Sequence, residues 1–85
     1  MKLIELLEVV NIDQKCRIFV DEKVCVKRIA VSTKKAVYDL KKEFRDDVMA
    51  DWPVTFVSVN RDYEGEIVMS IFIMKPSQYE KEMKK

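Results

Sequence analysis

The sequence predicts an α+β fold, in which a four-stranded antiparallel sheet is covered by helices in the order helix, strand, strand, helix, strand, strand, short helix. Three observations support this prediction. Residues 67–74 form a run without a charge, in which only Ser70 is polar. Apolar residues in 34–50 recur at helical spacing, and the segments 15–20 and 24–31 flank a charged turn. Two hairpins joined by a helix therefore form the expected framework.

Residues 67–74 are predicted to be the central strand. The run has the length of a strand, it is rich in isoleucine, and Gly65 and Pro76 bound it on either side. Successive side chains of a strand point to opposite faces, and here both faces are apolar. One face carries Ile67, Met69, Ile71 and Ile73, and the other carries Val68, Ser70, Phe72 and Met74. We therefore expect both faces to be covered, either by this chain or by another one.

The first helix and the first hairpin occupy the N-terminal third of the chain. Residues 2–10 have apolar side chains at helical spacing, and a helix this short must dock on the sheet because it is marginal alone. Strands 15–20 and 24–31 are expected to turn at Asp21-Glu22-Lys23. Charged residues interrupt both faces of the second strand, which indicates an edge strand or a bulge near Lys27-Arg28.

A long helix is predicted over residues 34–50, capped by the hydroxyl of Ser32 or Thr33. Its charged residues separate into two flanks at about 100° per residue. The basic flank, with an adjoining aromatic ring, holds Lys34, Lys35, Tyr38, Lys41, Lys42 and Arg45, and the acidic flank holds Asp39, Glu43, Asp46 and Asp47. Two interpretations remain open, an ordinary solvated helix with neighbouring charge pairs or a surface that binds a partner.

The segments after this helix supply the second hairpin and the C-terminal end. Pro53 pushes Trp52 out of helical geometry, and Trp52 is expected either to cap the core or to anchor a partner. Residues 54–60 predict the third strand, and a polar loop over 61–66 follows. Residues 77–80 have the spacing of a capping box and predict a short last helix.

Composition limits the function classes. The chain has 85 residues, which indicates a single domain over residues 1–85, and 16 basic against 15 acidic residues give a net charge of +1. We see no signal peptide or membrane-spanning run, and we expect a cytoplasmic protein. Histidine is absent, one glycine cannot form a phosphate-binding loop, and the two cysteines do not suggest a disulfide. The sequence therefore predicts neither an enzyme nor a cofactor or metal site.

Two functions are compatible with these limits. The first is a protein-binding module, whose partner is either a host protein or a second copy in a homodimer. If both main helices lie on one face of the sheet, apolar residues including Phe19 and Phe56 or Val57 face water on the other. The alternative is a nucleic-acid-binding module that uses the basic flank of the 34–50 helix. The candidate partner-binding residues are Lys34, Tyr38, Lys41, Lys42, Arg45 and Trp52.

The N-terminal stretch also carries a resemblance. The segment Lys2-Leu3-Ile4-Glu5-Leu6-Leu7-Glu8-Val9, followed by the short strand Cys16-Arg17-Ile18, resembles the start of small uncharacterised proteins from phages and mobile elements of Gram-positive bacteria. The resemblance covers about 20 residues of the chain. It implies an inhibitor that binds a host machine, of the anti-CRISPR or another anti-defence type.

Overall fold

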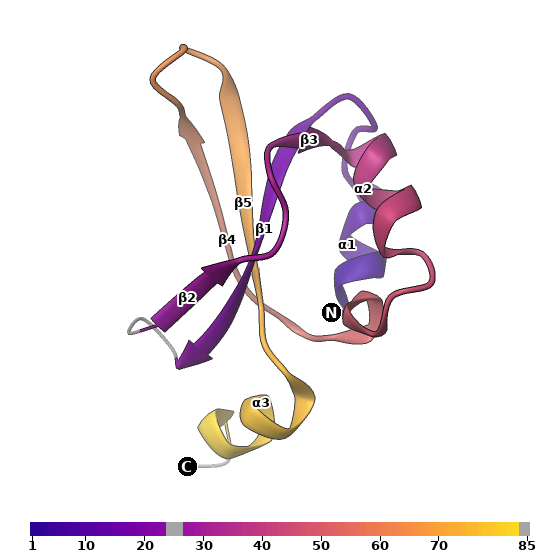
Figure 1. Cartoon of the computed structure of the whole chain (residues 1–85), viewed down its shortest axis with the longest axis vertical. Coiled ribbons are helices and arrows are strands. Elements are labelled where there is room, and N and C mark those ends of the chain that lie inside the picture. Colours follow the sequence, from indigo (N-terminus) through magenta and orange to yellow (C-terminus); the bar gives the residue numbers. More distant parts are fainter. Residues whose placement is uncertain (24–26, 84–85) are drawn as a thin grey trace.

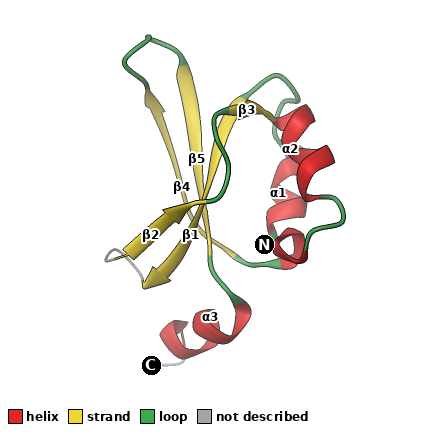
Figure 2. Ribbon diagram, in the orientation of Figure 1, coloured by secondary structure: helices red, strands yellow, loops and turns green. Residues whose placement is uncertain are grey.

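The computed structural model describes residues 1–23 and 27–83 and shows the α+β class that the sequence predicts (Figures 1 and 2). Helices and strands follow one another in nearly the expected order. They are α1 (Leu3–Val9), β1 (Lys15–Lys23), β2 (Lys27–Ala30), β3 (Lys35–Ala36), α2 (Val37–Phe44), the 3-10 helix η1 (Val48–Asp51), β4 (Val54–Arg61), β5 (Ile67–Ile73) and α3 (Pro76–Met83).

The sheet is five-stranded and mixed, so the prediction of four antiparallel strands is wrong in detail. Its main order is β2-β1-β5-β4, and the two-residue β3 pairs with β1 beside β2. β5 runs antiparallel to β4 but parallel to β1. The physical reason is burial: β1 and β5 carry the buried side chains of the sheet, whereas every residue of β2 is exposed and belongs at an edge.

The first hairpin does not turn at Asp21-Glu22-Lys23, because β1 continues through all three residues. Phe19 lies opposite Ala30 and Asp21 opposite Arg28, and the bulge predicted near Lys27-Arg28 is found in β1, between Asp21 and Lys23, directly opposite those two residues. Residues 24–26, which include Cys25, lie outside the described residues. Asp21 can stay in the strand although it is only 2% exposed, since its charge is satisfied there. It accepts hydrogen bonds from Arg28 Nε at 2.8 Å and from Thr55 Oγ1 at 3.1 Å.

The predicted helix over residues 34–50 is broken at both ends. Lys35 and Ala36 form β3 instead, and α2 begins with Ala36 as its N-cap. Ser32, expected to cap the helix, uses its hydroxyl to accept a hydrogen bond from the Ile18 backbone N–H at 3.0 Å. That bond continues the β1 ladder between β2 and β3, so pairing with β1 outweighs helix propensity at this point.

The C-terminal break of α2 follows from a local cap. The Asp47 carboxylate accepts a hydrogen bond from the Met49 backbone N–H at 2.8 Å, which starts the separate helix η1. A capping side chain offers the backbone an alternative to continuing the previous helix. As a result Val48, one of the apolar residues that recur at helical spacing in 34–50, is 73% exposed instead of buried.

The core lies between one face of the sheet and the helices α1 and α2, which Figure 1 shows on the same side of the sheet. Helix α1 is therefore docked on the sheet as predicted. The fully buried cluster takes side chains from both helices and from the two central strands. It comprises Leu3, Leu7, Cys16, Ile18, Val37, Leu40, Phe44, Ile71 and Ile73.

Residues 67–73 form the predicted central strand, but its opposite face is less open than expected. Phe72 is only 7% exposed, because its ring stacks on Phe19 at 5.1 Å and lies 5.8 Å from the Phe56 ring. The Arg28 guanidinium covers it 4.1 Å from the ring centroid. Side chains of the same chain thus cover the C-terminal half of β5 on this face, whereas Ile67 at the start of the strand remains 48% exposed.

The buried carboxylate of Asp21 gives a first prediction. Asp21→Ala leaves Arg28 and Thr55 without their shared acceptor, and we expect the free energy of unfolding to fall by about 2–4 kcal/mol. Urea denaturation measures this change. The exposed Asp46→Ala is the matched control, and it should alter stability by no more than about 0.5 kcal/mol. Equal effects of the two substitutions would contradict the structural role of Asp21.

The buried thiol of Cys16 gives a second prediction. Burial raises the pKa of the Cys16 thiol from 9.0 to about 11. Between these two pH values the folded protein keeps a proton that the unfolded chain releases, so the stabilising contribution is full below pH 9 and is lost as pH rises toward 11. Denaturation across this range should show a steeper loss of stability for the wild type than for Cys16→Val. Parallel curves would argue against the buried neutral thiol.

Candidate functional site

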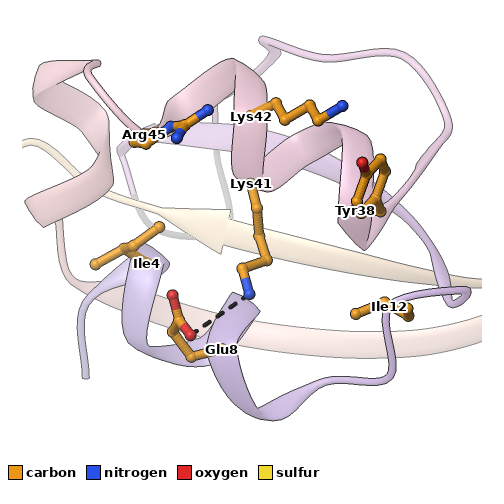
Figure 3. A pocket seen from close by; sticks show the side chains of 7 residues that line it. All are labelled: Ile4, Glu8, Ile12, Tyr38, Lys41, Lys42 and Arg45. Atoms are coloured by element: carbon orange, nitrogen blue, oxygen red, sulfur yellow. Dashed lines mark hydrogen bonds and ion pairs between the residues drawn. The ribbon is translucent and has the colours of Figure 1, made fainter.

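The candidate site is a groove of about 430 Å³ on the outer side of the helical layer, between α1 and α2. Figure 3 shows its seven lining side chains, which come from α1, from the loop that follows α1, and from α2 with its C-cap. They are Ile4, Glu8, Ile12, Tyr38, Lys41, Lys42 and Arg45. Four of the six predicted partner-binding residues thus come together.

The wall formed by α1 and its following loop is mainly apolar. Ile4 and Glu8 lie one helical turn apart on α1, and their neighbours Leu3 and Leu7 are buried against the sheet. Ile12 follows the helix in the loop, where its backbone C=O accepts a hydrogen bond from the Tyr38 N–H at 3.1 Å. This bond ties the loop to the first turn of α2, so the apolar end of the groove is held by backbone geometry.

The wall formed by α2 is aromatic and basic. Tyr38, Lys41, Lys42 and Arg45 recur at helical spacing, on a flank beside the buried stripe that faces the sheet. The Lys42 ammonium lies 4.3 Å from the centroid of the Tyr38 ring, a cation–π contact that Figure 3 shows along the helix. The predicted gathering of these residues on one flank therefore corresponds to one wall of a groove.

Charge in the groove is only partly neutralised. Lys41 Nζ reaches across to Glu8 Oε2 at 3.4 Å and links the two helices. Among the described residues, neither Lys42 nor Arg45 forms an ion pair with a carboxylate. The groove therefore presents two cationic groups beside apolar and aromatic surface, which suits a carboxylate next to an apolar side chain.

Two predicted residues lie elsewhere. The Lys34 ammonium bonds Asp62 at 2.7 Å and Glu66 at 2.9 Å, and Glu64 is 3.9 Å away. Its hydrogen bond to Asp62 contributes most to raising the pKa of Lys34 and to lowering the pKa of the Asp62 carboxyl below 3.8. Lys34 thus joins the segment before β3 to the loop between β4 and β5, instead of facing a partner.

Trp52 is half-buried at the far end of the core, which agrees with the capping interpretation. Its backbone C=O accepts a hydrogen bond from Leu3 N–H at 3.0 Å. It also lines a second cavity of about 300 Å³, together with Val20, Asp21, Glu22, Lys75 and Gln78. Trp52 therefore does not contribute to the groove between α1 and α2.

Sequence reasoning missed the residues that α1 and its following loop contribute. Ile4 lies beside the buried positions of α1, and Ile12 occurs in a segment that reads as a turn. The one signal in the sequence was Ile12, an isoleucine in an otherwise polar loop. Neither Ile4 nor Ile12 lines a groove until two helices that are distant in the sequence pack together, and no local pattern shows that packing.

Comparison with known proteins adds no relative: no family model, curated protein or solved structure matches the chain. Within the described residues, the helices are too short or too polar to cross a membrane. The same residues contain no group of three or more potential metal-ligating side chains.

The contacts of Lys34 give a third prediction. The Glu64 and Glu66 backbone N–H groups donate to Asp62 Oδ1 at 2.9 and 3.0 Å, so the loop depends on the position of that carboxylate. We expect Lys34→Met to speed hydrogen exchange of these amides and to raise the Asp62 pKa toward 3.8, as measured by NMR. Because the folded pKa of Asp62 is lowered, its stabilising contribution is present above pH 3.8 and is lost as pH falls.

Lys35→Met is the matched control for this prediction. Lys35 pairs with Glu43 at 2.6 Å, and among the described residues no ion pair or side-chain hydrogen bond joins it to the loop between β4 and β5. Loop exchange and the Asp62 titration should therefore match the wild type. A shift of the Asp62 pKa in the control as large as in Lys34→Met would show that the direct contact is not the cause.

Proposed function

We propose that this protein is a small, non-enzymatic protein-binding module that takes an acidic segment of a partner protein in the groove between α1 and α2. The observation that supports the proposal is the side-by-side placement of Lys42 and Arg45 with exposed apolar and aromatic side chains. The partner segment would place a carboxylate against the cations and an apolar side chain against Ile12 and Tyr38.

The two parts of the groove have different energetic roles. Ile12 and Tyr38 are both exposed, so covering them removes apolar surface from water and contributes affinity. Lys42 and Arg45 are exposed as well, and exposed cations contribute mainly to the association rate and to orientation. A neutral apolar segment would leave this orientation undetermined, which is why we propose an acidic one.

The dimensions of the groove support a short segment rather than a whole folded surface. A volume of about 430 Å³ lies within the usual range of roughly 300–1,000 Å³ for pockets that hold compact ligands. Two or three side chains of an extended or helical segment fill such a volume. Hot spots of protein interfaces commonly consist of a few anchor side chains in such a pocket.

Nucleic-acid binding, the alternative function, has less support. Three lysines of the basic flank already have carboxylate partners: Lys34 with Asp62, Lys35 with Glu43 and Lys41 with Glu8. Phosphate contacts require clustered, available positive charge, and Glu8 lies within the groove itself. We therefore retain nucleic-acid binding only as an outcome that the experiment must distinguish.

A phage or mobile-element source remains a prediction, based on the resemblance of residues 2–9 and 16–18. If it holds, the acidic segment would belong to a host protein, and the module would act as an inhibitor by occupying a surface of that protein. Such a role needs no catalytic group, and it is compatible with a groove that offers only apolar contact and positive charge.

The test uses fluorescent peptides of about a dozen residues, in which Asp and Glu surround one Leu, Ile or Phe. The double variant Lys42→Glu/Arg45→Glu should weaken binding of these peptides about tenfold or more, as measured by fluorescence anisotropy. Lys75→Glu/Lys81→Glu reverses the same number of exposed charges outside the groove and should bind like the wild type.

Two results would contradict the proposal. One is equal loss of peptide binding in both double variants, since only net charge would then matter. The other is preferential binding of a duplex or single-stranded oligonucleotide at low salt that weakens steeply as salt rises, because that behaviour is the signature of phosphate contacts.

A further inference from the structure

The outer edge of β4 is open over most of its length. β4 is the last strand of the sheet and lies at its left margin in the upper half of Figure 1. The N-terminal segment covers only its beginning: Lys2 forms a bridge to Pro53, and the Val54 N–H donates to the Met1 C=O at 2.8 Å. From Thr55 to Arg61, no described strand pairs with this edge.

Backbone hydrogen bonds reveal which groups of β4 point outward. The Asp62 N–H donates to the Glu66 C=O at 2.9 Å, so Asp62 faces the β5 side of the hairpin. Asp62 and Glu66 continue the register in which Arg61 lies opposite Ile67. Hydrogen-bonding direction alternates along an antiparallel pair. The N–H and C=O groups of Val57, Val59 and Arg61 therefore point away from the sheet.

The two edges of the sheet differ in their protection. Between Thr55 and Asn60, β4 has neither a charge nor a proline, and Phe56 and Val59 are 54% and 56% exposed. The opposite edge, β2, carries Lys27 and Arg28 and faces a bulge in β1. Lysines, charges and bulges are the usual devices that block pairing at an edge. In β4 they occur only at the two ends, as a register shift between Val54 and Phe56 and as the charge of Arg61, so residues 57–60 are left without them.

We propose that the outer edge of β4 pairs with β4 of a second copy of this chain, antiparallel and centred on Val59. In this register Val59 meets Val59 of the second copy, and Val57 meets Arg61 of the second copy on each side of the centre. The three outward residues of each chain thus meet the same three residues of the other. About six backbone hydrogen bonds form, because each such pair exchanges two.

Charge and symmetry favour a second copy as the occupant. Arg61 is the only charged residue of β4. In the centred register the two Arg61 residues are four residues apart along the strands, which is roughly 13 Å at the usual rise per residue. A two-fold contact uses the same edge of both chains, and the protected β2 edges then end the assembly. The structure therefore favours a closed dimer with one continuous sheet over an open fibre.

This interface is separate from the groove proposed above. The groove lies between two helices on one face of the sheet, whereas the contact with the second copy lies along the β4 edge. Either proposal can fail without the other. In the dimer each particle carries two grooves, so a partner with two acidic segments would bind more tightly than a partner with one.

The experiment measures mass by sedimentation equilibrium, from about 1 µM to 1 mM protein, because dimerisation depends on concentration. We expect the wild type to move from 10.1 kDa toward twice that mass. Val59→Pro removes an outward N–H, which an edge strand tolerates, and it should stay folded and monomeric throughout. Ser58→Pro is the matched control: it removes an N–H that faces β5 and should lower the melting temperature strongly.

A second readout and a second control complete the test. Hydrogen exchange at the Val57, Val59 and Arg61 amides should slow as wild-type concentration rises, whereas exchange at Ile29 in β2 should not change. Val48→Lys, at a site 73% exposed in η1, should dimerise like the wild type. A wild type that stays at 10.1 kDa at every concentration, or a folded Val59→Pro that still dimerises, would overturn the proposal.

Discussion

The parallel pairing of β5 with β1 is the constraint on which the rest of the structure depends. It places Ile71 beside Ile18 and Ile73 beside Val20, which gives one continuous apolar face for the helices to cover. Because β2 and β4 lie at opposite edges of the sheet, the chain must cross that face to reach β4. The crossing contains α2 and η1, and it brings α2 against α1. The groove between these helices and the open edge of β4 are both consequences of this one pairing.

Two charged residues hold elements together that the apolar core does not join. Asp21 receives hydrogen bonds from Arg28 of β2 and Thr55 of β4, so one buried carboxylate links strands from both hairpins. Lys34 connects the segment before β3 to the loop after β4 through three carboxylates. A buried or half-buried charge is retained only when it is paired, and these pairs fix the position of the loops relative to the sheet.

The two proposed contact surfaces differ in the groups that recognise the partner. The groove offers side chains, so its selectivity comes from the position of Lys42 and Arg45 relative to apolar surface. The β4 edge offers backbone groups, which any extended chain can match, so its selectivity comes from register and symmetry. Self-pairing removes an edge that would otherwise attract other chains, and it leaves the groove available for a partner.

The sequence by itself determined the α+β class, the docking of residues 3–9, the central position of residues 67–73 and the gathering of Tyr38, Lys41, Lys42 and Arg45 on one helical flank. These features follow from periodicity and local propensity, which a single segment carries alone. Only the tertiary structure decided the parallel register of β1 and β5, the burial of Asp21, the pairing of Lys34 and the second wall of the groove. Each of these depends on residues far apart in the chain, whose mutual distances no local pattern encodes. For the same reason the predicted 34–50 helix was wrong at both ends, since pairing with β1 and the cap at Asp47 compete with helix propensity there.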